Sequence, residues 1–212
     1  MFFLGCLTVF ALACLKGCSD DERSESQQDA SENTAGCPSI PHREYMDCPA
    51  GVRSCAVLAL GTGEGPGARK ADAPKVHGLW PQVEPNGNSD CINATNPAGP
   101  ATVDDIPSCY REWAELRFLN YEWIKHGMCS GTANQSDFFS QTCKLAKRPL
   151  EIMASSRAAG LNLSDSAEQL QQLGFCVWGL LTDFEEILLS GCAGSDGIFK
   201  LAAYTAFSEE CT

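Results

Sequence analysis

The sequence lacks the motifs of several common hydrolytic sites. It contains no GxSxG motif, and it does not match the zincin motif HExxH, because Tyr121 stands in place of the first histidine and Lys125 in place of the second. No two cysteines stand at CxxC spacing, which disfavours a structural zinc site. Only three histidines are present, at His42, His77 and His126. Serine-hydrolase and zinc-dependent functions are therefore poor explanations of this sequence.

Positive charge is also scarce. The 212 residues include 15 Lys and Arg against 27 Asp and Glu, a formal net charge of −12. Without the acidic residues 19–35 and Lys16, 21 acids and 13 bases remain, so residues 36–212 still carry a net charge of about −8. Recruitment of a partner by a large basic surface is therefore excluded.

The chain has no apolar run long enough to span a bilayer as a helix, which takes about 20 residues. Residues 2–15 are apolar, but they are too few and are interrupted by Thr8. They are typical of the hydrophobic core of a signal peptide, although no basic residue precedes them, and we expect residues 1–18 to be a signal peptide. A lipid anchor on Cys18 is an alternative, because the residues before it partly match a bacterial lipobox.

Two segments follow the expected signal peptide. Residues 19–35 are polar and acidic and contain no apolar residue except alanine, so they cannot bury enough surface to offset the entropy of folding. We expect them to form a disordered tether. Residues 36–212 contain no internal repeat and suffice for one domain with a substantial core. We expect no stable membrane insertion.

The cysteines after the expected signal peptide number ten, and an even number indicates five disulfides formed in an oxidising compartment. This favours a secreted or extracellular protein, or one of the periplasm or of a secretory or lysosome-like compartment. The ten are Cys37, Cys48, Cys55, Cys91, Cys109, Cys129, Cys143, Cys176, Cys192 and Cys211.

Local patterns predict a mixture of strands and helices. Short apolar runs predict strands at residues 55–60 and 75–80, and an apolar and aromatic run predicts a late strand at residues 198–207. Apolar spacing of three and four predicts a helix from near Asp104 through Tyr110, Trp113, Leu116 and Leu119. Further helices are expected from Ser136 to a break or kink at Pro149, and from Asp165 to Gly174.

Two motifs carry the chemistry of the sequence. Residues 77–81 read HGLWP, and residues 121–129 read YEWIKHGMC. In these segments the chain resembles the ribonuclease T2 family, which is recognised by HGLWP followed, some tens of residues later, by HEWxKHGxC or a close variant. The resemblance implies an α+β fold, in which an antiparallel β-sheet carrying the first motif packs against several helices, and a disulfide-rich domain.

The residues of the second motif also form a cluster by helical spacing. Glu122, Lys125 and His126 stand at i, i+3 and i+4, so a helix brings a carboxylate, an ammonium and an imidazole to one face. Taken alone, this triplet is more typical of a solvated salt-bridged turn. His77 taken alone is likewise more typical of a structural histidine. The presence of both motifs in one chain favours the catalytic interpretation.

Metal-independent RNA cleavage needs a base for the 2′-hydroxyl, an acid for the departing 5′-oxygen and positive charge beside the phosphorane. The family resemblance implies that His126 is the base and His77 the acid, and that Glu122 with Lys125 stabilises the transition state. The products would be 2′,3′-cyclic phosphates, a lyase-type step, which hydrolysis opens to 3′-phosphates. Single-stranded RNA is the expected substrate, DNA is not, and no metal or other cofactor is expected.

Aromatic residues of the motifs have different expected roles. The resemblance implies that Trp80 offers a ring face to a base, and because stacking tolerates any base, low base specificity is expected. An ordinary core position is the alternative for Trp80. Trp123 points away from Glu122 and is expected in the core. His42 matches no motif and receives no role.

The chain departs from the family pattern at two places. Tyr121 stands where most of the family has a phosphate-binding histidine, and a phenol can donate a hydrogen bond to phosphate but adds no charge. We expect weaker phosphate binding and not an inactive protein. After Leu60, residues 61–63 read GTG and lack the aromatic and Gln residues of many family members. One base subsite is therefore expected to be poorer.

The resemblance also implies a disulfide between Cys91 and Cys129, which would tie the loop after the first motif to the second motif. A disulfide-bonded Cys129 disfavours a thiol enzyme. Two other functions stay open: a secreted recognition or signalling protein on the same scaffold, and a nuclease tethered to a membrane through Cys18. Degenerate binders usually lose a catalytic histidine, and this chain keeps both. We expect a monomer.

Overall fold

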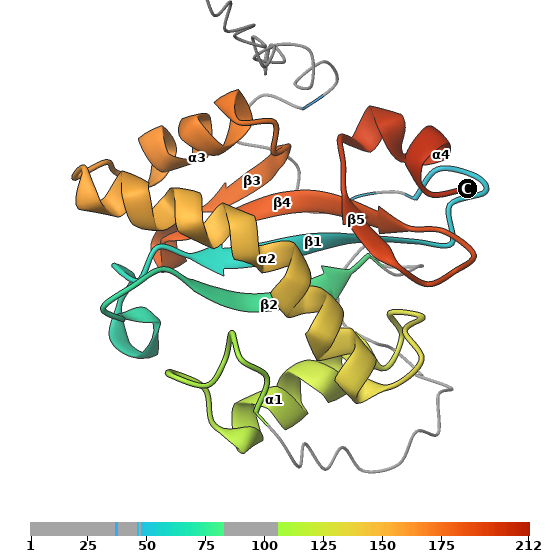
Figure 1. The fold of residues 1–212 in the computed structure, drawn as a ribbon, viewed down its shortest axis with the longest axis horizontal. Coiled ribbons are helices and arrows are strands. Elements are labelled where there is room, and N and C mark those ends of the chain that lie inside the picture. Colours follow the sequence, from blue (N-terminus) through green and yellow to red (C-terminus); the bar gives the residue numbers. More distant parts are fainter. Residues whose placement is uncertain (1–36, 38–45, 47, 83–105) are drawn as a thin grey trace, which may run out of the picture.

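The described part of the chain is one α+β unit built on an antiparallel sheet. The computed structural model describes residues 37, 46, 48–82 and 106–212. In these residues the strand order is β2-β1-β4-β3, β5 also pairs with β4, and every pairing is antiparallel (Figure 1). This confirms the expected fold class. The expected signal peptide and tether lie outside the described residues.

The strands only partly match the sequence-based expectation. The two early strands are confirmed, whereas β3 and β4 were not predicted. The predicted strand at 198–207 is wrong beyond Leu201, because the chain there turns into a short helix, α4 (Phe207–Glu210), whose Phe207 is buried against the sheet. The strands are β1 (Ser54–Gly61), β2 (Lys75–Pro81), β3 (Val177–Leu181), β4 (Glu186–Ala193) and β5 (Phe199–Leu201).

Both faces of the sheet are covered. Alternate residues of β1, such as Leu58 and Leu60, belong to the large core that the helices cover. Cys55 and Val57 point to the other face, where they join a smaller cluster that includes Phe207. Because side chains of a strand alternate between faces, burial on both sides explains why β1 is an almost continuous apolar run.

The helix predicted from near Asp104 through Leu119 is wrong over residues 106–115 and confirmed from Leu116 onward. Residues 108–113 form turns, and the helix α1 covers only Leu116–Glu122. The apolar spacing had a different cause: Tyr110 and Trp113 pack their rings together, with centroids 5.5 Å apart, and both rings contact Phe118 of α1. The spacing therefore marks an aromatic cluster and not one helix face.

The long helix α2 (Gln135–Ala158) crosses the sheet and continues past Pro149, so the expected break is absent (Figure 1). Its axis bends along its length in Figure 1, as a proline inside a helix favours. Asn134 caps its first turn by accepting a hydrogen bond from the Asp137 amide. The next helix, α3 (Leu163–Gln172), ends as expected before Gly174, which has a φ of 88°.

Disulfides fasten the segments around the sheet. Four bridges join described cysteines: Cys37 to Cys176, Cys48 to Cys55, Cys109 to Cys143, and Cys192 to Cys211. The bridge from Cys109 ties the turns before α1 to α2. Cys129 is also disulfide-bonded, whereas Cys91, its expected partner, lies outside the described residues.

Candidate active site

A bulge in β2 sets the direction of His77. In the pairing of β1 with β2, Ala59 lies opposite Gly78 and the next residue, Leu60, lies opposite Val76, so the register skips His77. An extra residue in one strand reverses the alternation of side chains beyond it. His77 and Trp80 are three positions apart in the sequence. Because of the bulge, their side chains lie on the same side of β2, with ring centroids 5.0 Å apart.

Two glycines of the motifs allow close packing, Gly78 between β2 and the second motif and Gly127 within the second motif. A Cβ atom on Gly78 would overlap Oε2 of Glu122 and would lie 2.9 Å from Nε1 of Trp80. A Cβ atom on Gly127 would overlap the ring of Trp123. The glycines of both motifs are thus required by packing and not by an unusual backbone angle.

The second motif lies at the end of α1, where the helix widens into a π-helical segment, Trp123–Gly127. Such segments are rare and often occur at functional sites. The structure brings two members of the predicted cluster together, since Glu122 Oε2 lies 4.0 Å from His126 Nε2. Both side chains are buried, with residue exposures of 1% and 4%. Lys125 is less buried, and its Nζ atom lies 5.4 Å from the ring centroid of Tyr121.

The Glu122 carboxylate lies between the two histidines of the motifs. Its Oε1 atom is 3.7 Å from Nε2 of His77, and its Oε2 atom accepts a hydrogen bond of 3.3 Å from Nε1 of Trp80. The Trp80 ring also packs against His126, with centroids 5.5 Å apart. One buried carboxylate therefore connects residues of both motifs, although they are far apart in the sequence.

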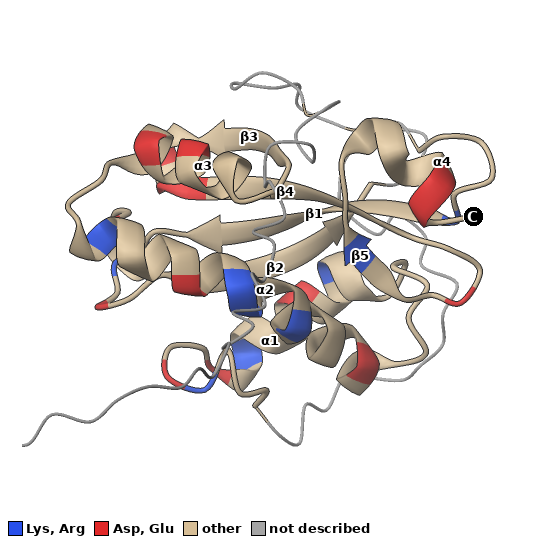
Figure 2. Ribbon diagram, turned by 45° about the horizontal axis from the view of Figure 1, so that its top comes forward, with Lys and Arg blue, Asp and Glu red and all other residues tan. Residues whose placement is uncertain are grey.

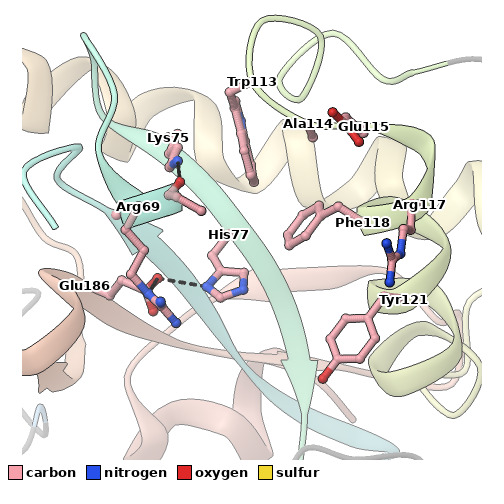
Figure 3. Close-up of a pocket in the computed structure, with 12 residues that line it drawn as sticks. Arg69, Lys75, His77, Trp113, Ala114, Glu115, Arg117, Phe118, Tyr121 and Glu186 are labelled. Carbon is pink, nitrogen blue, oxygen red and sulfur yellow. Dashed lines mark hydrogen bonds and ion pairs between the residues drawn. The ribbon is translucent and has the colours of Figure 1, made fainter. Parts of the chain in front are cut away.

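Glu186 is a site residue that sequence reasoning missed. This first residue of β4 is 2% exposed, and its Oε1 atom lies 2.8 Å from Nδ1 of His77 (Figure 3). Its only signal in the sequence is a carboxylate directly before the apolar run ILLSGCA, where a strand would bury it. Arg69 also approaches this carboxylate, with Nε 3.6 Å from Oε1.

These two carboxylates control the charge of His77. Burial acts to lower the pKa of His77, but interactions with Glu122 and Glu186 outweigh it and raise the pKa to about 9. The imidazole is therefore protonated at neutral pH. A half-buried cation between two buried carboxylates still reaches solvent and is able to donate a proton.

A pocket of about 520 Å³ opens beside His77 (Figure 3). Its lining includes the aromatic residues Trp113, Phe118 and Tyr121, and Tyr121 is 54% exposed. Glu122, His126 and Trp80 are not among the lining residues. The pocket therefore opens beside His77 without being lined by the second histidine.

The remaining predictions concern Trp123, His42, a metal site and a membrane span. Trp123 is 1% exposed and belongs to the core, as expected. His42 lies outside the described residues. Over the described ranges, no group of three or more His, Cys, Asp or Glu side chains is arranged to hold a metal ion. No helix in the described part of the chain is long and apolar enough to cross a membrane.

Comparison with known proteins relates the chain to ribonucleases. A family model described as the ribonuclease T2 family matches residues 55–173. Ribonuclease 1 of Arabidopsis thaliana is 25% identical over 120 residues, which cover 49% of this chain and 52% of that protein. A ribonuclease of Aeromonas hydrophila is 35% identical over 88 residues, which cover 40% of this chain and 38% of that protein. The chain thus spans about half, or less, of the length of these curated relatives.

Two solved structures are similar at low identity. Ribonuclease MC1 from the seeds of bitter gourd is 17% identical with a TM-score of 0.44, covering 69% of this chain and 92% of that chain. Actibind, a T2 ribonuclease, is 17% identical with a TM-score of 0.49, covering 79% of this chain and 88% of that chain.

Proposed function

Because the chain belongs to the ribonuclease T2 family, we propose that it is an endoribonuclease that cleaves single-stranded RNA without a metal ion. The 2′-hydroxyl is the nucleophile, and the products are 2′,3′-cyclic phosphates that are then hydrolysed to 3′-phosphates. DNA is not a substrate, because a deoxyribose has no 2′-hydroxyl. The half-buried imidazole of His77, held between the buried carboxylates of Glu122 and Glu186, is the observation that carries the proposal.

The protonated state of His77 supports its role as the general acid. With a pKa of about 9, this imidazolium holds a proton at neutral pH and is able to give it to the departing 5′-oxygen. His126 is the general base. The Glu122 carboxylate is 4.0 Å from its Nε2 atom and would stabilise the imidazolium that forms when His126 accepts the 2′-hydroxyl proton.

The reaction proceeds in two steps. In the first, His126 takes the 2′-hydroxyl proton, the 2′-oxygen forms a bond to phosphorus, and the bond from phosphorus to the 5′-oxygen breaks as His77 protonates that oxygen. In the second, the roles of the two histidines are exchanged: His77 takes a proton from water, the water oxygen forms a bond to phosphorus, and the bond from phosphorus to the 2′-oxygen breaks as His126 protonates that oxygen. The ammonium of Lys125 stabilises the negative charge of the phosphorane in both steps.

Two aromatic residues contribute to substrate binding. The Tyr121 hydroxyl donates a hydrogen bond to phosphate, and its exposure beside the pocket supports contact with substrate. The Trp80 ring contacts the rings of both histidines. It offers part of its face to a base of the substrate, and because such stacking tolerates any base, low base specificity is favoured. Its indole N–H is already bonded to Glu122, so Trp80 also positions that carboxylate.

The protein is proposed to act as a monomer in an oxidising compartment. Four disulfides among the described residues support such a compartment. Residues 1–18 are proposed to be a signal peptide, residues 19–35 a tether and residues 36–212 the catalytic domain. Secretion is the proposed destination.

The direct test is incubation of the purified protein with single-stranded RNA in excess EDTA. We expect cleavage, with cyclic phosphate ends appearing before 3′-phosphates, and no cleavage of a DNA strand of the same sequence. Cleavage that EDTA abolishes, or an equal rate on DNA, would contradict the proposal.

A further inference from the structure

The pocket beside His77 lies where the leaving part of the substrate must lie, if the proposed function holds. The acid protonates the 5′-oxygen of the departing nucleoside, so this nucleoside is next to His77. The pocket begins at His77 and excludes His126 from its lining. Its volume of about 520 Å³ lies within the usual range of ligand pockets, about 300 to 1,000 Å³, and is compatible with one nucleotide.

Three cations line this pocket. Figure 3 shows Arg69 and Lys75 on the sheet side of His77, with Arg117 of α1 across from them next to Tyr121. The carboxylates of the lining are Glu186, which is engaged with His77 and Arg69, and Glu115.

Two of the cations, Arg69 and Lys75, are held in place by contacts with neighbouring residues. The Arg69 guanidinium carbon lies 3.9 Å from the ring centroid of Phe184. The Lys75 ammonium donates to the carbonyl oxygen of Ala68 at 2.8 Å and lies 4.5 Å from the ring centroid of Trp113. Burial lowers the pKa of Lys75, although Glu186 opposes this effect, so its charge is partly desolvated. A partly desolvated, preorganised cation favours an anion more than a solvated surface lysine does.

This group of cations stands out against an acidic protein. The whole chain carries a formal net charge of −12. In the view of Figure 2, Lys and Arg are interspersed with Asp and Glu over the described elements. A local excess of positive charge in a concave site focuses the field and attracts an anionic group there. Arginine is also well suited to phosphate, because its planar guanidinium matches two phosphate oxygens.

We propose that Arg69, Lys75 and Arg117 form a second phosphate subsite, which binds the phosphate on the 3′ side of the departing nucleoside. This inference rests on the proposed function, because it takes the scissile phosphate to lie between His77 and His126. The subsite makes the protein prefer an RNA chain that continues beyond the cleavage point over one that ends with the leaving nucleoside.

The test compares three short substrates of identical bases at constant ionic strength. They are a dinucleoside monophosphate (NpN), the same compound with a 3′-terminal phosphate (NpNp) and the same compound with a 5′-terminal phosphate (pNpN). We expect kcat/KM for NpNp to exceed that for NpN by about tenfold, as charged hydrogen bonds to one phosphate allow. The value for pNpN should stay close to that for NpN, because its added phosphate lies on the other side of the cleavage point.

Variants of the pocket residues test whether the preference for NpNp over NpN arises from this pocket. Arg117→Met and Lys75→Met should each reduce the ratio of NpNp to NpN, and the double variant should bring it close to one. Lys200→Met is the matched control, because Lys200 pairs with Cys192, six residues and roughly 20 Å along β4 from Glu186. It should keep the ratio of the unaltered protein.

A binding measurement separates failure of the subsite from failure of the enzyme. By calorimetry, a nucleoside 3′,5′-bisphosphate should bind about tenfold more tightly than the nucleoside 5′-phosphate, and Arg117→Met should remove the difference. Equal binding of the two ligands, equal cleavage of NpN and NpNp, or an equal gain for pNpN would each overturn the subsite. If the folded protein cleaves no RNA, the proposed function fails, and the binding comparison still decides the subsite.

Discussion

Nδ1 of His77 lies 2.8 Å from Oε1 of Glu186, which joins the bulge of β2 to the first residue of β4. Glu122 approaches the other ring nitrogen, Nε2, at 3.7 Å. The imidazole is therefore held at both nitrogens, and the two carboxylates favour its charged form. This arrangement has consequences for pH dependence.

Glu186→Gln should move the alkaline limb of the pH profile to lower pH. In the unaltered protein the limb should lie near pH 9, where His77 loses its proton. Removing one carboxylate charge should lower the pKa of His77 by about one to three units, and the limb should follow. The profile of kcat/KM against pH measures it, with Glu151→Gln as a control because that carboxylate is exposed and pairs with Arg148. An unmoved alkaline limb would show that His77 is not the acid.

The same shift predicts how stability depends on pH. A pKa raised from 6.5 to about 9 on folding stabilises the folded state fully below pH 6.5, and this contribution is lost as the pH rises through about 9. Glu186→Gln should therefore reduce the loss of stability over this interval. Urea unfolding at a series of pH values measures it.

His77→Ala and His126→Ala should each remove most of the ribonuclease activity while the protein stays folded. Each histidine moves one proton, a role that typically contributes about 10²- to 10⁴-fold. Because the two act as a unit, the double variant should be little worse than either single variant. Activity on single-stranded RNA and circular dichroism measure the two properties. Substantial cleavage by folded His126→Ala would exclude His126 as the base.

Gly78→Ala should destabilise the protein and reduce activity, because the new Cβ atom would overlap a Glu122 carboxylate oxygen. Overpacking of this kind typically costs about 1 to 3 kcal/mol. Gly61→Ala is the control for stability, since a Cβ atom there would meet nothing closer than 3.8 Å. Thermal unfolding measures both. Equal stability of the two variants would contradict the close approach of β2 to Glu122.

The bridge expected between Cys91 and Cys129 is open to peptide mapping under non-reducing conditions. A single crosslinked peptide pair containing both cysteines is the expected result. Replacing both cysteines by alanine should lower the free energy of unfolding by about 2 to 5 kcal/mol, because the bridge restricts the unfolded chain. A crosslink from Cys129 to another cysteine would show that the pairing is wrong.

The sequence identified His77 and the Glu122 cluster because short motifs mark them, but it did not identify Glu186. Glu186 lies 109 positions after His77, and no local pattern expresses the contact. It arises because β1 pairs with β2 on one side and β4 on the other, which places Glu186 next to Gly61. The bulge at His77 could not be predicted from the sequence either, because a register shift depends on the partner strand.

Tyr121 gives the most direct test of how substrate meets the site. Its ring lines the pocket and lies under the Lys125 ammonium, while its hydroxyl is the only group that phenylalanine would remove. If the hydroxyl only donates a hydrogen bond to phosphate, Tyr121→Phe should lower kcat/KM by the value of one such bond, about 1.5 to 3 kcal/mol or roughly 10- to 150-fold. Tyr121→His should preserve or raise the activity, because a protonated imidazole adds a charge. A complete loss of activity in folded Tyr121→Phe would instead implicate the phenol in proton transfer.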